Sequence, residues 1–171
     1  MLIRYIIPTP IGRMEIIGSE LGVQSLKLCE NQSEALEPGI QEQAVMLEHH
    51  PVAECARQLA EYFAGAREVF EVKLDWGGAP EFHRQVWAAL LKIPYGKTTS
   101  YSAIAEQLGN PAAVRAVGMA NRSNPIAIVV PCHRVIGKAG ELRGYFYGLD
   151  TKMMLLRHEN PVKYAEQGAL F

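Results

Sequence analysis

The stretch that decides the fold is Thr99–Ile136, TSYSAIAEQLGNPAAVRAVGMANRSNPIAIVVPCHRVI. Its first half predicts two short helices: Thr99 or Ser100 can cap the first, and Gly109 can end it. Asn110 can cap the second helix, with Pro111 at its first position, where the missing N–H costs nothing. Two short helices joined by a tight turn that contains glycine predict a helix-turn-helix, although such pairs also occur as ordinary packed helices.

The second half of the stretch leads to a cysteine. Ile126–Val130 is apolar, rich in β-branched residues and too short for a typical helix, so it predicts a buried extended segment. Pro131 fixes its own φ and favours an extended conformation at Val130. We therefore expect Cys132 to be held at the end of a rigid, buried segment.

Cys132 becomes a good nucleophile only as a thiolate, which requires a nearby base or positive charge. His133 and Arg134 follow directly, and Lys152 lies further along the chain. Neighbours on an extended chain point to opposite sides, so His133 would reach the thiol directly only if the chain turned here, and we expect a bridging water as the link. Glu159 is a candidate for orienting His133. The alternative is a buried core cysteine beside a surface histidine.

Outside this stretch, the patterns predict an α+β fold in two domains. Residues 1–77 form a small N-terminal α/β domain, with a short antiparallel sheet and a helix; residues 78–171 form a mainly helical C-terminal domain that contains the helix-turn-helix. The N-terminal domain is expected to have strands at Leu2–Ile7, Met14–Ile17, Gly22–Leu28 and Phe70–Leu74, a loop or short helix in residues 30–45, and a helix at 52–64. The C-terminal domain is expected to add helices at Phe82–Ile93 and Thr151–His158.

The charge is divided unevenly along the chain. Residues 1–79 carry 6 basic and 12 acidic residues, a net charge of −6, whereas residues 80–160 carry 10 and 5, a net charge of +5. A basic half beside an acidic half indicates contact with a polyanion through one face. The alternative is chance combined with solvated helix faces.

Composition excludes several protein classes. No apolar run reaches the roughly 18 residues of a membrane span, and Met1–Tyr5 has no features of a signal peptide. Three cysteines without CxxC spacing indicate a reducing compartment, and we expect the cytoplasm. Because Cys29, His49, His50 and Cys55 form no recognisable zinc spacing, we expect no metal, and we expect no cofactor.

Phe82–Glu159 resembles the C-terminal domain of the O6-alkylguanine-DNA alkyltransferases, also called methylated-DNA–protein-cysteine methyltransferases. The match is carried by segments at the family spacing: Arg115-Ala116-Val117-Gly118, Asn124-Pro125, Pro131-Cys132-His133-Arg134-Val135 and Leu155-Leu156-Arg157-His158-Glu159. The first 77 residues fit the small N-terminal domain of that family only loosely.

The resemblance implies single-turnover, irreversible transfer of an alkyl group from O6 of guanine in double-stranded DNA to a cysteine, by a monomer, with O4 of thymine left open as a second substrate. It assigns catalytic roles to six residues: Cys132 as alkyl acceptor, His133 as base through water, Glu159 to orient His133, Asn124 to fix the loop, Lys152 to favour the thiolate and Tyr101 to protonate the leaving base.

The resemblance also implies a DNA-binding surface in the minor groove. Arg115 would fill the stack when the damaged nucleotide is flipped out, because a buried thiol cannot meet O6 inside a duplex. Other residues would allow close approach, contact the DNA or line the pocket: Ala113, Gly118, Arg122, Ser100, Val135 and Tyr145. Taken singly, residues such as Tyr101, Arg115 and Tyr145 are better explained by packing or a solvated charge. Taken as a set, they favour function.

The sequence departs from the family pattern at two places near the expected pocket. Phe146 and Tyr147 are bulky where members usually carry small or polar residues, and Asn121 stands where many have an apolar residue. Two other function classes remain: a helix-turn-helix protein that binds alkylated bases without transferring anything, and a Cys-His hydrolase. The reactive cysteine disfavours the first, and the lack of an oxyanion-hole glycine pattern disfavours the second.

Overall fold

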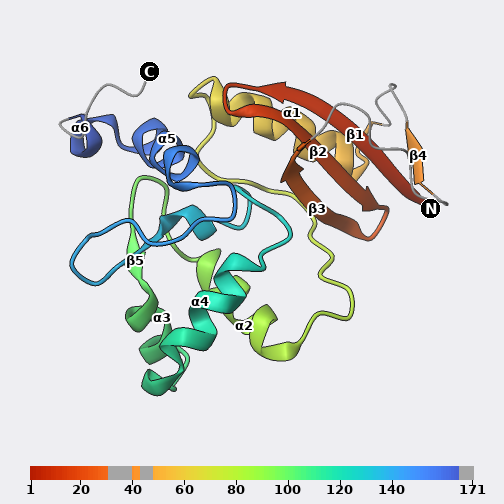
Figure 1. The fold of residues 1–171 in the computed structure, drawn as a ribbon. Helices are drawn as coiled ribbons and strands as arrows, with labels where there is room; N and C mark the ends of the chain where they lie inside the picture. The colour runs from red at the N-terminus through yellow and green to blue at the C-terminus, as the bar shows by residue number, and fades with distance from the viewer. Residues whose placement is uncertain (31–39, 43–47, 166–171) are drawn as a thin grey trace. The chain divides into compact units, whose positions relative to one another are not determined.

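The computed structural model describes residues 1–30, 40–42 and 48–165, and the chain divides into two compact units, 1–77 and 78–171. The first unit contains a sheet and a helix, and the second is mainly helical (Figure 1). The predicted α+β class is therefore confirmed. Each unit is described by itself.

The first unit is built on a four-stranded sheet in the order β3-β2-β1-β4. Two hairpins join the first three strands in antiparallel pairs, and β4 lies parallel to β1. The short β4 was not predicted; the rest of the expected loop or helix at 30–45 lies almost wholly outside the described residues. The strand bounds are β1 Leu2–Thr9, β2 Gly12–Ser19, β3 Gly22–Leu28 and β4 Ile40–Glu42.

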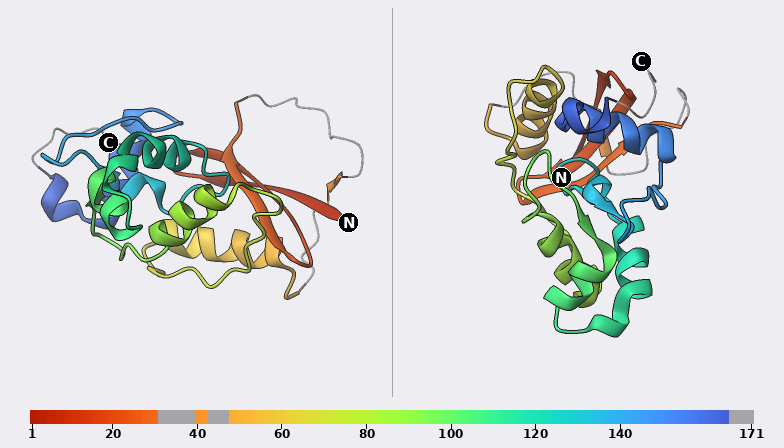
Figure 2. Two further views of the ribbon diagram at one scale, coloured as in Figure 1. Left: turned by 90° about the horizontal axis from the view of Figure 1, so that it is seen from below. Right: turned by 90° about the vertical axis from the view of Figure 1, so that its left-hand side faces the viewer.

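Helix α1 (Pro51–Phe63) lies along one face of this sheet (Figures 1 and 2), which confirms the helix predicted at 52–64. Its apolar positions recur at helical spacing and bury one stripe of the helix against the strands. The buried residues are Val52, Cys55, Leu59 and Tyr62 on the helix and Met14, Ile16, Val23 and Leu26 on the sheet.

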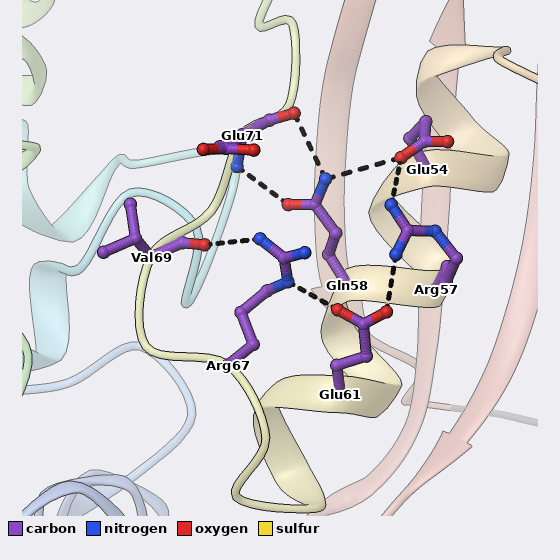
Figure 3. Close-up of polar contacts among 7 residues, drawn as sticks. All are labelled: Glu54, Arg57, Gln58, Glu61, Arg67, Val69 and Glu71. Atoms are coloured by element: carbon purple, nitrogen blue, oxygen red, sulfur yellow. Dashed lines mark hydrogen bonds and ion pairs between the residues drawn. The ribbon is translucent and has the colours of Figure 1, made fainter.

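The segment after α1 is tied back to the helix by side chains (Figure 3). Gln58 donates to the carbonyl of Glu71 at 3.2 Å and accepts from its N–H at 2.8 Å, while Arg67 pairs with Glu61 at 2.6 Å. The strand predicted at 70–74 is wrong: only Leu74 forms a bridge to the sheet. The backbone groups of Glu71 bond to a side chain instead of a strand ladder, which satisfies them equally well.

The second unit surrounds the helix-turn-helix with short elements. Two short strands, β5 and β6, pair in parallel and join the start of the helix-turn-helix to the residues that follow Cys132. The bounds are α2 Glu81–Leu90, β5 Thr99–Ser100, α3 Tyr101–Gln107, η1 Pro111–Ala113, α4 Val114–Arg122, η2 Cys132–Arg134, β6 Val135–Ile136, α5 Leu149–Glu159 and α6 Pro161–Tyr164.

The predicted helix pair is present as α3 and α4, which pack against each other. The Ser100 hydroxyl accepts from the N–H of Ala103 at 3.1 Å, and Gly109 takes φ +76° just beyond the end of α3. The predicted capping role of Asn110 is wrong, because its side chain forms no capping hydrogen bond. Pro111 instead begins the 3-10 turn η1, which leads into α4.

The apolar run 126–130 is buried as predicted, but the prediction of an extended conformation is wrong. The run folds into a tight turn in which the N–H of Val130 donates to the carbonyl of Ile126 at 3.0 Å. Ile128 takes φ +71°, a conformation that β-branched residues rarely adopt. The turn satisfies buried backbone groups locally, which an unpaired extended segment could not do.

Candidate active site around Cys132

Cys132 begins the 3-10 turn η2 and is only 6% exposed. Asn124 fixes the preceding loop: its carbonyl oxygen accepts from the N–H of Ile126 at 3.0 Å, and its amide donates to the carbonyl of Val130 at 2.8 Å. These two hydrogen bonds close the turn that leads to Cys132. The loop is thus held by the side chain to which the resemblance assigned this role.

The thiol of Cys132 experiences opposing electrostatic effects. Burial raises its pKa, whereas the Asn124 side chain, the Lys152 charge and nearby backbone N–H groups act to lower it. Cys55, which is buried in α1, experiences burial alone, and its pKa rises to about 12. Cys132 therefore rests as a neutral thiol, but unlike Cys55 it is surrounded by groups that stabilise the thiolate.

His133, Arg134 and Glu159 form a buried network. Nε2 of His133 lies 2.7 Å from Oε1 of Glu159, and the Arg134 guanidinium donates to both oxygens of the same carboxylate at 2.8 and 2.9 Å. Arg134 also donates to the carbonyl of Ile93 at 2.7 Å. Burial acts to raise the pKa of Glu159, but His133 and Arg134 outweigh it and hold that pKa well below its ordinary value.

The network favours one protonation state of His133. Burial lowers the pKa of His133, although Glu159 opposes this effect, so the imidazole is neutral near pH 7. A neutral ring that donates from Nε2 to Glu159 leaves Nδ1 as an acceptor. Nδ1 is buried and has no protein hydrogen-bond partner in the described part of the chain. The histidine can therefore take up a proton at Nδ1.

Lys152 is a buried cation on α5. Its ammonium group donates to the carbonyls of Val135 at 2.6 Å, Arg143 at 2.7 Å and Gly144 at 3.4 Å. Burial lowers its pKa to about 8, and the Cys132 charge opposes that shift. Within the described ranges no carboxylate pairs with Lys152, so its charge is available to a thiolate at Cys132.

A cleft of about 600 Å³ lies between the helix-turn-helix and residues 137–144. Tyr101 and Asn121 contribute to its wall, and the Asn121 amide donates to the carbonyl of Cys132 at 3.3 Å. One acidic residue lines the cleft, Glu141, against four cations: Arg115, Arg122, Lys138 and Arg143. Such a cationic rim suits phosphate groups. Burial, together with the Cys132 charge, raises the pKa of Tyr101 and keeps its hydroxyl protonated.

The structure brings some of the expected DNA-contacting residues together and leaves others apart. Four expected residues line the cleft: Tyr101, Arg115, Gly118 and Arg122. Four others are absent from its described lining: Ser100, Ala113, Val135 and Tyr145. The Ser100 hydroxyl caps α3, the carbonyl of Val135 binds Lys152, and Tyr145 stacks edge-on with Tyr147 at 5.6 Å between ring centroids.

Two site residues were missed by the sequence reasoning. Arg134 was considered only as a cation for Cys132, whereas its guanidinium binds Glu159. Asn121 was noted only as a departure from the family pattern. The sequence feature that could have identified Asn121 is its position one helical turn after the buried Val117, which places a polar side chain on the packed face of α4.

Within residues 1–30 and 48–165, no group of three or more His, Cys, Asp or Glu is arranged to hold a metal ion. Among the described helices, none has both the length and the apolar character that a membrane crossing requires.

Comparison with known proteins finds two family matches that together cover most of the chain. Residues 2–76 match "6-O-methylguanine DNA methyltransferase, ribonuclease-like domain", and residues 81–161 match "6-O-methylguanine DNA methyltransferase, DNA binding domain". Similar curated proteins include methylated-DNA–protein-cysteine methyltransferases from Mycolicibacterium paratuberculosis, 46% identical over 90% of this chain and 89% of that protein, and from Methanosarcina barkeri, 45% identical over 90% and 94%.

A solved structure shows the same fold. The crystal structure of Mycobacterium tuberculosis OGT in complex with DNA superposes with a TM-score of 0.82 at 42% identity, covering 93% of each chain.

Proposed function

Because the chain belongs to the 6-O-methylguanine DNA methyltransferase family, we propose that it repairs DNA by transferring an alkyl group from O6 of guanine to Cys132. The observation that carries this assignment is the buried thiol of Cys132. It is surrounded by groups that stabilise its anion, and it lies next to a cleft rimmed by cations. The resemblance inferred from the sequence is confirmed at the level of the family.

The proposed chemistry is one displacement. Nδ1 of His133 takes the thiol proton through a water molecule, and the resulting sulfur anion forms a bond to the alkyl carbon as the bond from that carbon to O6 breaks. The Tyr101 hydroxyl donates a proton to the departing guanine, because an anion would be costly in a desolvated pocket. The product is a thioether at Cys132, which no group in the site can reverse, so each molecule acts once.

The protein would reach its substrate by flipping the nucleotide. Cys132 is 6% exposed, so an alkyl group inside a base-paired stack cannot approach it. Arg115, which is exposed on α4 beside the cleft, is placed to occupy the space left in the stack. The other cations of the rim would hold the phosphates. Readout from the minor groove suits an enzyme that must ignore sequence.

The remaining parts of the proposal concern setting and substrate range. We place the enzyme in the cytoplasm and expect it to act as a monomer. It needs no cofactor, because the displacement requires only protein side chains and water. O4-methylthymine is a second substrate to test. The exposed Phe146 and its neighbour Tyr147 are the residues to vary when larger alkyl groups are compared.

Transfer of a labelled methyl group tests the proposal. Duplex DNA carrying labelled O6-methylguanine is mixed in excess with the protein, and the label on protein and DNA is followed. We expect one methyl group per protein molecule and none on Cys132→Ser, which should still bind the duplex. Binding without transfer would instead support the non-transferring base-binding class, and repeated turnover would support a hydrolase.

A further inference from the structure

Glu141 places a negative charge in the described lining of a cleft whose other charged groups are cations. Its carboxylate is held at a defined position. Oε1 accepts from Nε and Nη2 of Arg143 at 3.1 and 2.9 Å, and Oε2 accepts from the backbone N–H of Ala139 at 3.0 Å. The backbone N–H of Glu141 itself and the Arg143 guanidinium lower the pKa of Glu141, so the carboxylate is ionised at neutral pH.

The backbone leaves room for this carboxylate at Gly137. A Cβ atom at residue 137 would lie 2.1 Å from the carboxyl carbon and Oε1 of Glu141 and 2.6 Å from Oε2. Both distances are far shorter than a van der Waals contact, so a side chain at 137 would push the carboxylate away. The N–H of Gly137 donates to the carbonyl of Glu141 at 2.8 Å and closes the turn. We call the Arg143 guanidinium, the Ala139 N–H and the space at Gly137 the anion seat.

The anion seat is accessible, and its donors fit a phosphate. The side chain of Arg143 is 66% exposed and that of Glu141 is 41% exposed, so the pair is open to exchange with a ligand. Exposed ion pairs of this kind add little to stability, so the fold does not depend on the pair. Guanidinium and backbone N–H groups commonly donate to DNA phosphates. The other charged groups of the lining, Arg115, Arg122 and Lys138, favour the same ligand.

We infer that the anion seat binds a phosphate of the DNA backbone, and that Glu141 occupies the seat until DNA displaces its carboxylate. This inference rests on the proposed repair of DNA. Because Glu141 already neutralises Arg143, binding of a phosphate there exchanges one anion for another and adds little to the affinity. The exchange weakens binding to a duplex of any sequence, which suits a protein that must leave undamaged sites and move along DNA.

A double-mutant cycle tests the exchange. Dissociation constants for an undamaged duplex are measured at several salt concentrations for the wild type, Glu141→Gln, Arg143→Gln and the double variant. Glu141→Gln keeps the size of the side chain without its charge, so it should bind about 2- to 5-fold more tightly than the wild type. The slope of log K against log salt concentration should steepen by about 0.9, the value for one further phosphate contact. Arg143→Gln should cost the Glu141→Gln variant at least about 2-fold more affinity than it costs the wild type.

Glu106→Gln is the matched control, because it makes the same change of charge at an exposed position of α3 outside the described lining of the cleft. Arg143→Gln should cost this variant as much affinity as it costs the wild type. Additive effects of Glu141→Gln and Arg143→Gln would overturn the inference, because Glu141 would then act through its charge alone. Unchanged affinity in Glu141→Gln would overturn it as well. The proposed function fails on a different result: a wild type that takes no methyl group from a duplex containing O6-methylguanine.

Discussion

Substituting glutamine for Glu159 removes one negative charge from the centre of the buried network and changes the shape very little. The carboxylate binds Nε2 of His133 at 2.7 Å and the Arg134 guanidinium at 2.8 and 2.9 Å. Arg134 is 6% exposed and His133 is fully buried, so neither can turn to solvent for compensation. Removing one partner of such a buried pair costs about 3–5 kcal/mol, because the remaining charge is left unpaired.

Equilibrium unfolding in urea measures this cost, with Glu141→Gln as the control. Glu141 also pairs with an arginine, Arg143, at 2.9 Å, but its side chain is 41% exposed, so its loss should leave the urea midpoint close to that of the wild type. In a chain of this size each kcal/mol lowers Tm by about 2–4 °C, so Glu159→Gln should melt about 6–20 °C below the wild type. Equal destabilisation by the two variants would refute the reasoning that burial decides the difference.

Three further predictions follow from the same geometry. Burial lowers the pKa of His133 below 6.5, so as the pH falls through 6.5 the unfolded chain binds a proton that the folded protein does not bind. The urea midpoint of unfolding should therefore decrease from pH 7 to pH 5. The pKa of Glu159 is also lowered in the fold, so the loss of stability should continue below pH 4.5. A flat midpoint over that range would contradict the neutral buried histidine. Lys152→Met removes a charge that lowers the pKa of Cys132, so the rate at which iodoacetamide labels that thiol should reach its half-maximum at a higher pH than in the wild type. An unchanged pH of half-maximal labelling would count against the role of Lys152. Tyr101→Phe should slow methyl transfer by about 100-fold or more, with the affinity for DNA unchanged. Tyr95 lies outside the lining of the cleft, so the control Tyr95→Phe should leave the transfer rate unchanged. Equal effects of the two variants would exclude Tyr101 as a specific proton donor.

Local signals in the sequence were sufficient for the helices that position the site. Ser100 and Gly109 act on backbone groups within a few residues of themselves, so the start and end of α3 could be predicted from neighbours alone. The stripe of apolar residues on α1 is equally local. The fold class followed from these elements and from the alternating strands before them.

Predictions failed where a distant or irregular partner decides the conformation. The run at 126–130 forms a turn because Asn124 and the backbone close it, which hydrophobic pattern alone cannot reveal. Residues 70–74 do not form a strand because Gln58 occupies the backbone groups of Glu71.

The site itself was predictable in part. The residues of the Cys132 segment were found from one contiguous motif. Glu159 and Lys152 were candidates from the chemistry that a thiolate requires, and the family resemblance gave them their roles. The contact of Arg134 with Glu159 joins positions 25 residues apart, and no local pattern indicates it. The hydrogen bond from the Asn121 amide to the carbonyl of Cys132 depends on the path of the chain between them, so only three-dimensional geometry identifies it.

Mass spectrometry of peptides after reaction tests the role of Cys132 most directly. The protein is mixed with a duplex containing O6-methylguanine and digested, and the three peptides that carry Cys29, Cys55 and Cys132 are weighed. The Cys132 peptide should gain about 14 Da, one methyl group in place of a hydrogen, while the other two stay unchanged. A methyl group on Cys29 or Cys55, or on no cysteine at all, would contradict the assignment.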